Sequence, residues 1–149
     1  MRALETHQAF SPLVVRRSRE PRRVLVIALD GAVPERLADA EILVVAPALN
    51  TWLRHWLSDE DSARRRAEER AAVLVKRLRP MAARIEGRTG DADPLLAIAD
   101  ALSTFPADEI VIAALPDVSV ARAEALIARA RDRFPVPVDR TGARLAIAA

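Results

Sequence analysis

Two adjoining stretches of sequence decide the fold: GDADPLLAIADAL at residues 90–102 and ADEIVIAAL at residues 107–115. Asp93 suits the N-cap of a helix, because its carboxylate can accept hydrogen bonds from the free N–H groups of the first turn. Pro94 suits the first helical position, which needs no N–H. The apolar residues that follow recur on one helical face, and the later run of β-branched residues is typical of a strand covered on both faces. The two stretches predict half of an α/β unit, with a loop, a capped helix, a turn and a buried strand.

Apolar runs elsewhere in the chain predict further strands, and helically spaced apolar residues predict further helices. The predicted order is strand, short connector, strand, and then three helix–strand pairs, the last strand lying in the tail. This alternation indicates an open, mainly parallel five-stranded Rossmann-like sheet with helices on both faces. The strands are expected at residues 24–29, 41–46, 83–87 and 109–115 and at a tail run, 136–138 or 145–148; the helices are expected between Ser58 and Pro80, at 94–103 and, capped by Ser119, at 120–133.

The connector between the first two strands, residues 32–40, is short. Parallel neighbours need a crossover of about a dozen residues, usually with a helix. Either the first crossover is trimmed or the first strand pair is irregular. We expect a trimmed first crossover helix.

Composition narrows the chemistry. The 149 residues suit one α/β domain at residues 22–149, preceded by a flexible, arginine-rich arm at 1–21. Without cysteine, the chain has no disulfide, no Cys-ligated zinc and no thiol catalysis. The net charge of +2 gives little reason to expect nucleic-acid binding, although the arm could contact a polyanion. No apolar run approaches the roughly 20 residues of a membrane span, so we expect a cytoplasmic protein without membrane contact.

The order of elements and several motifs resemble the universal stress protein family over residues 23–139. The motifs are a glycine and an acid at Gly90 and Asp91, the helical segment Ile98–Ala101 and the strand Asp108–Ile112. The first strand also ends in Asp30 and Gly31, as in that family. The resemblance implies an adenine nucleotide alpha hydrolase-like fold, a role in stress response, and a homodimer that pairs through the last strand.

The loop after the fourth strand departs from the nucleotide-binding members of the family. Those members carry glycines whose backbone N–H groups cradle phosphates. Here residues 113–119 contain no glycine, while Pro116 lacks an N–H and Asp117 would repel phosphate. We therefore expect no ATP binding of the usual kind and no cofactor, with an adenine nucleotide as the alternative. The cleft that would hold it is lined by Asp30, Gly31, Val44, Ala113 and Leu115.

Other polar residues each have a structural and a functional interpretation. Asp30 either forms a turn or faces a ligand at the carboxyl end of its strand. Asp91 and Asp93 either cap the helix or, with Glu86 or Asp100, hold a metal; we expect no metal.

The long helix and the segment before it carry the remaining candidates. His55, Ser58 and Asp59 either begin the long helix or form a hydrolase-like group, and we expect no catalysis there. Trp52 and Trp56 either cover the end of the sheet or form a lid or a subunit contact. On the helix itself, Arg64–Arg66 is either solvated or binds an anion, and the pairs Glu60–Arg64 and Glu69–Arg70 are expected on its outer face.

These observations favour a stress-protein-like regulatory or ligand-sensing domain that acts by binding and dimerisation, not as an enzyme. One alternative is an adenine-nucleotide-binding stress protein with an atypical phosphate loop. Another is a small-molecule enzyme of the nucleotide hydrolase-like group. The homodimer is expected to pair through Val136–Val138 or Leu145–Ala148, so that Val138→Asp or Ile147→Asp would give a monomer.

Overall fold

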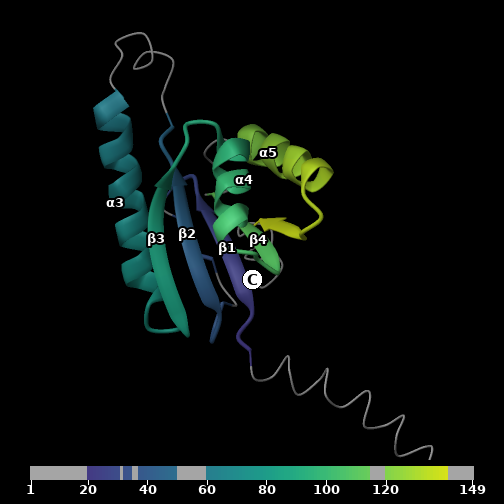
Figure 1. Cartoon of the computed structure of the whole chain (residues 1–149). Helices are drawn as coiled ribbons and strands as arrows, with labels where there is room; N and C mark the ends of the chain where they lie inside the picture. Colours follow the sequence, from purple (N-terminus) through teal and green to yellow (C-terminus); the bar gives the residue numbers. More distant parts are fainter. Residues whose placement is uncertain (1–19, 31, 35–36, 50–59, 115–119, 141–149) are drawn as a thin grey trace, which may run out of the picture.

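The computed structural model describes residues 20–30, 32–34, 37–49, 60–114 and 120–140, with side chains from residue 122 in the last range. Within them the chain forms one open, fully parallel sheet in the order β3-β2-β1-β4-β5 (Figure 1). The predicted fold class is thereby confirmed. The strands are β1 (Arg23–Ala28), β2 (Glu41–Pro47), β3 (Arg84–Gly90), β4 (Glu109–Ala113) and β5 (Val138–Arg140).

Helices cover both faces of the sheet, as predicted. α3 (Glu60–Leu78) packs on one face, and α4 (Pro94–Thr104) and α5 (Val120–Arg133) pack on the other (Figure 1). Successive residues of β1 serve the two cores in turn: Val24 and Val26 face α3, whereas Leu25 and Ile27 face α4 and α5. The central strands are therefore continuous apolar runs because both their faces are buried.

The first crossover is short, as expected. Between β1 and β2 the described residues (29–30, 32–34 and 37–40) contain no helix. Ala32 and Leu37 are buried in the same core as α3, so this connector covers part of the face that a crossover helix would occupy. It turns into β2 at Asp39, which has a φ of 61° and whose N–H donates to the Met81 carbonyl over 2.7 Å.

The capped helix is confirmed, because the N–H of Leu95 donates to Oδ1 of Asp93 over 3.0 Å and Pro94 opens α4. The predicted caps Ser58 and Ser119 lie outside the described residues. The strand before α4 was predicted too short, since β3 continues through residues that we expected to form a loop. It stays paired with β2 as far as Gly90, whose carbonyl accepts from Ala48 over 3.1 Å.

Two glycines of β3 allow helices to approach closely. A Cβ on Gly90 would lie 2.8 Å from both Ala97 of α4 and Val45 of β2. A Cβ on Gly87 would lie 2.8 Å from Val75 of α3, on the opposite face. Both contacts are shorter than carbon atoms tolerate, so the two helices reach this strand only because it carries no side chain there.

The tail forms the other edge of the sheet. Val138 of β5 is buried against β4 and α5, and Pro137 precedes it at the edge position predicted for it. Val138→Asp would therefore disrupt the core, and it is not a selective test of dimerisation. The run Leu145–Ala148, with Ile147, and most of the arm lie outside the described residues. No described helix combines the length and apolar character needed to cross a membrane.

Candidate ligand-binding site

The sheet reverses its winding between β1 and β4, whose crossovers leave toward opposite faces. Open α/β sheets bind ligands at the carboxyl ends of the strands at such a switch point. Asp30 lies there, one residue beyond the bond that Leu29 donates to the Ala113 carbonyl over 3.1 Å. Oδ1 of Asp30 accepts from the N–H of Ala32 over 2.9 Å, so this carboxylate also shapes the turn after β1. Asp30 therefore forms the predicted turn at the carboxyl end of β1, and its contact with a ligand stays a prediction.

Arg70 reaches the same end of the sheet from α3. Its Nη2 donates to the carbonyl of Pro47, the last residue of β2. Its Nε is buried and makes no hydrogen bond within the described part of the chain. Burial lowers the pKa of the Arg70 guanidinium, while the nearby Asp30 carboxylate acts in the opposite direction. Because arginine stays protonated at neutral pH, the site carries a partly desolvated positive charge beside a carboxylate.

A pocket of about 400 Å³ opens over this pair. α3 supplies most of its wall, with an apolar part formed by Val73 and Leu74. Val73 is 48% exposed although it lies beside the core. The lining is Asp30, Arg66, Glu69, Arg70, Val73 and Leu74.

Of the other residues predicted for a nucleotide cleft, the two that the structure describes do not line this pocket. Val44 and Ala113 are both 0% exposed and belong to the core beneath it. Gly31 and Leu115 lie outside the described residues, as does the loop expected to lack a phosphate cradle. Of the three described residues in this set, only Asp30 lines the pocket.

Sequence reasoning missed Arg70 and placed it, with Glu69, on the outer face of the long helix. That prediction is wrong for Arg70, which is half-buried and directed at the end of β2. The available signal was its position next to the buried stripe of Ala67, Ala71 and Leu74. An arginine flanking such a stripe can lay its stem along the core and bring its head to the rim.

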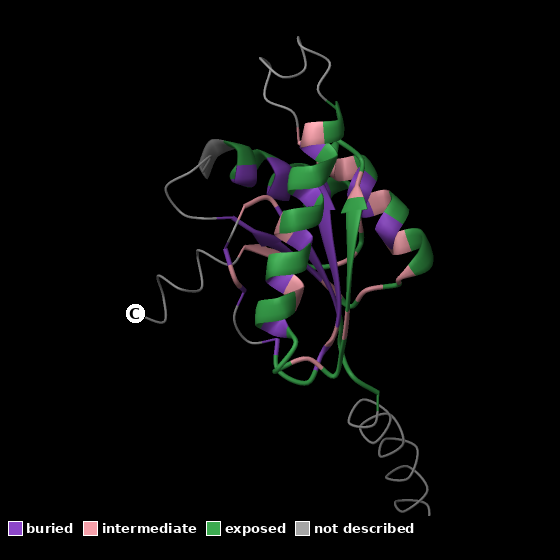
Figure 2. Cartoon of the chain, turned by 90° about the vertical axis from the view of Figure 1, so that its left-hand side faces the viewer, coloured by how far each residue is buried: buried purple, intermediate pink, exposed green. Residues whose placement is uncertain are grey.

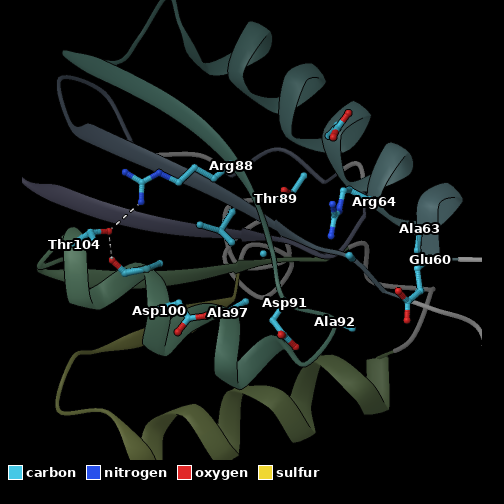
Figure 3. Close-up of a pocket in the computed structure, with 15 residues that line it drawn as sticks. Glu60, Ala63, Arg64, Arg88, Thr89, Asp91, Ala92, Ala97, Asp100 and Thr104 are labelled. Carbon is cyan, nitrogen blue, oxygen red and sulfur yellow. Dashed lines mark hydrogen bonds between the residues drawn. The ribbon is translucent and has the colours of Figure 1, made fainter.

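A larger cavity of about 800 Å³ lies beside β3, between α3 and α4 (Figure 3). Two of its polar side chains bind each other, since Arg88 donates to Thr104 over 2.9 Å; Arg88 also donates to Glu86, outside the lining, over 2.9 Å. Asp91 accepts from the N–H of Asp93 over 2.9 Å, which supports the loop before α4. The remaining polar lining includes Glu60, Arg64, Glu68 and Asp100.

The main residues considered for a metal or an anion lie at the start of α4 and on α3. Asp91 and Asp93 both accept from backbone N–H groups at the start of α4. The described ranges contain no cluster of three His, Cys, Asp or Glu side chains that could hold a metal ion. Arg64 lines the larger cavity and Arg66 lines the pocket at Asp30, so these two arginines open onto different pockets. His55, Ser58, Asp59, Trp52 and Trp56 all lie outside the described residues.

Comparison with known proteins supports the fold through structure alone. No protein-family model matches the sequence, and no curated protein matches it. A crystal structure of a hypothetical protein superposes with a TM-score of 0.56 at 14% identity, covering 81% of this chain and 95% of that one. A universal stress protein family protein from Arabidopsis thaliana, solved with AMP bound, superposes with a TM-score of 0.52 at 14% identity, covering 82% and 92%. The chain therefore has the fold of a universal stress protein.

Proposed function

We propose that this chain is a universal-stress-protein-like sensing domain that acts by binding a small ligand and by dimerising, without catalysis. The observation that carries the proposal is the partly desolvated Arg70 guanidinium beside Asp30 at the switch point of the sheet. Open α/β sheets bind their ligands at this place. In this chain the place is occupied by the Arg70 guanidinium, whose Nε has no hydrogen-bond partner in the described residues.

The chemistry of the pocket indicates the kind of ligand. A guanidinium recognises a carboxylate or phosphate through paired N–H donors. The Asp30 carboxylate accepts from a hydroxyl or amine, and Val73 and Leu74 offer an apolar wall. A small molecule that combines an anionic group with a hydroxyl or amino group would satisfy all three features.

The same lining favours binding over catalysis. In the described part of the pocket the polar side chains are two arginines and two carboxylates, without a hydroxyl or an imidazole. A nucleophile activated by a neighbouring base is therefore not part of this lining.

Thermal unfolding against a panel of nucleotides, sugar phosphates and dicarboxylates tests the proposal, with Arg70→Gln compared to Arg65→Gln. Arg65 is exposed on the same helix and does not line the pocket. At least one compound should raise the melting temperature of the wild type and of Arg65→Gln, and leave Arg70→Gln unchanged. The proposal is wrong if no compound acts, or if Arg70→Gln responds as the wild type does.

A second candidate is adenine-nucleotide binding with an atypical phosphate loop. One observation favours it: the Arabidopsis protein that shares this fold was solved with AMP bound. In this chain the phosphate of a bound nucleotide would have to contact Arg70 and Arg66, because residues 113–119 carry no glycine. Calorimetric titration with AMP and ATP decides this, and the absence of heat at millimolar nucleotide would eliminate it.

A further inference from the structure

Within the described residues, one side of the β3 backbone has no strand partner. It is the terminal strand of the described sheet and pairs with β2 along all seven of its residues. The Gly90 carbonyl accepts from Ala48, and the Arg84 N–H approaches the Ala40 carbonyl at 3.5 Å. Backbone groups alternate in direction along a strand. The N–H and C=O groups that point toward β2 are therefore those of Arg84, Glu86, Arg88 and Gly90. The N–H and C=O groups of Ile85, Gly87 and Thr89 then face the open edge, where most residues are exposed (Figure 2).

We propose that a second copy of this chain pairs antiparallel with this edge, with the two-fold axis at Gly87. The inference rests on the dimerisation in the proposed function and places it at β3 instead of β5. In this register Gly87 lies opposite Gly87 of the second copy, and Ile85 lies opposite Thr89. Each of these facing pairs exchanges two N–H···O bonds, because all three residues present their backbone groups to the open side.

The charges of β3 complement themselves in this register. Glu86 lies opposite Arg88 of the second copy, and Arg88 lies opposite Glu86. Both pairs occupy positions without mutual backbone bonds, where facing side chains are closest. Within one chain these two side chains already form a 2.9 Å ion pair and remain 61% and 41% exposed, so they are accessible to a second copy.

The neighbouring registers are opposed by the same charges. A slip of the facing residues by two positions in one direction sets Glu86 opposite Glu86 and Arg84 opposite Arg88. The same slip in the other direction sets Arg88 opposite Arg88. Like charges directly opposite each other destabilise a strand pair. The sequence of β3 therefore specifies the axis at Gly87.

α3 allows the two sheets to meet. Gly87 lies against Ala71 and Val75, and the groove beside it, about 320 Å³ in volume, is lined by Glu68, Ala72 and Val75 from this helix. Because α3 packs over both β3 and β2, strand pairing would bring the two α3 helices to about 10 Å apart, the usual packing distance. The exposed Ala72 is small enough for that approach, and Val75 would become buried.

β5 is a less suitable edge for pairing with a second copy. It has three residues, and its outward carbonyl, that of Val138, already accepts from Nε and Nη2 of Arg131 over 3.1 and 2.8 Å. A strand added there would have to displace a charged donor from this carbonyl.

Charge reversal tests the proposal by sedimentation equilibrium of the full chain. Glu86→Arg and Arg88→Glu each place like charges opposite one another, so each variant should dimerise at least tenfold more weakly than the wild type. The double variant exchanges the two charges and should restore the wild-type mass. An equimolar mixture of the two single variants should form a heterodimer, since one chain then carries two positive and the other two negative side chains.

Several results would overturn the proposal. These are a wild type that stays monomeric at millimolar concentration, single variants that keep the wild-type dissociation constant, or a mixture that fails to associate. Circular dichroism at low concentration confirms that each variant is folded. The Arg70 ligand assay distinguishes the two proposals, because monomeric Glu86→Arg retains the whole Asp30–Arg70 pocket and should bind as the wild type does.

Discussion

The two edges of the sheet are protected in different ways. At β5 the strand is short, Val138 is buried, and Arg131 occupies its outward carbonyl. At β3 the strand is long and one side of its backbone has no partner in the described part of the chain; protection comes from the charges of Arg84, Glu86 and Arg88. Charged residues on an edge discourage indiscriminate strand addition. One edge is thus closed by its own chain, whereas in our proposal the charges of the other admit only a partner that carries matching charges.

The largest expected difference between the edges concerns Val138→Asp. This substitution places an unpaired charge in a site that is 3% exposed, and we expect it to lower the free energy of unfolding by about 3–5 kcal/mol. Ile85→Asp, at the half-buried inward position of β3, should lower it by about 1–2 kcal/mol. Urea unfolding of both variants measures the difference, and equal losses would show that β3 is packed as tightly as β5.

Substitution of the two glycines of β3 should have a smaller effect on stability. Gly90→Ala meets Ala97 and Val45 on two sides and should lower stability by about 2–3 kcal/mol, because both neighbours are packed in the core. Gly87→Ala meets mainly Val75, so we expect a loss of about 1–2 kcal/mol.

Thermal or urea unfolding of the combined variant Gly87→Ala, Val75→Ala provides the control. Removal of the Val75 methyl groups should recover part of the loss caused by the alanine at position 87. Strictly additive losses in the double variant would mean that α3 does not approach β3 as closely as described.

Arg131→Ala should expose the edge of β5. The variant loses two charge-assisted hydrogen bonds to the Val138 carbonyl, and a decrease of about 1 kcal/mol in stability is expected because this arginine is largely exposed. Light scattering should also detect association that grows with concentration. Arg129→Ala, an exposed position on the same helix, is the matched control, and the same association in both variants would contradict a specific role for Arg131.

The smallest effect concerns Arg88 itself. Its ion pair with Glu86 is exposed, so Arg88→Ala should change the stability of the dilute monomer by less than about 0.5 kcal/mol. The side chain of Arg140 in β5 is 9% exposed and binds Glu124 over 2.8 Å, so Arg140→Ala should lower the stability more. Chemical unfolding below the dimer dissociation constant measures both. A large loss for Arg88→Ala would mean that this residue serves the fold.

Sequence alone predicted the elements whose signals are local. The cap at Asp93, the proline at the first turn of α4 and the β-branched run of β4 each act within a few residues. The full length of β3 was missed because its polar residues lack any alternation, and it is a strand only through pairing with β2. Arg70 was misplaced for the same reason, since its partner Pro47 lies 23 positions away in the sequence. Tertiary neighbours decided both, and the one local signal, the position of Arg70 beside the buried stripe of α3, does not identify its partner.

The short connector between β1 and β2 also determines which residues of α3 are exposed and can be substituted. In a fully wound sheet a second helix would lie beside α3 and cover Val73 and the pocket at Asp30. Here that area is surface, so residues on this side of α3 can be substituted without repacking the interior. A connector long enough to form a helix of its own would cover this area. The length of this one connector therefore determines how much of α3 is exposed beside Asp30, while the sheet and its register do not depend on it.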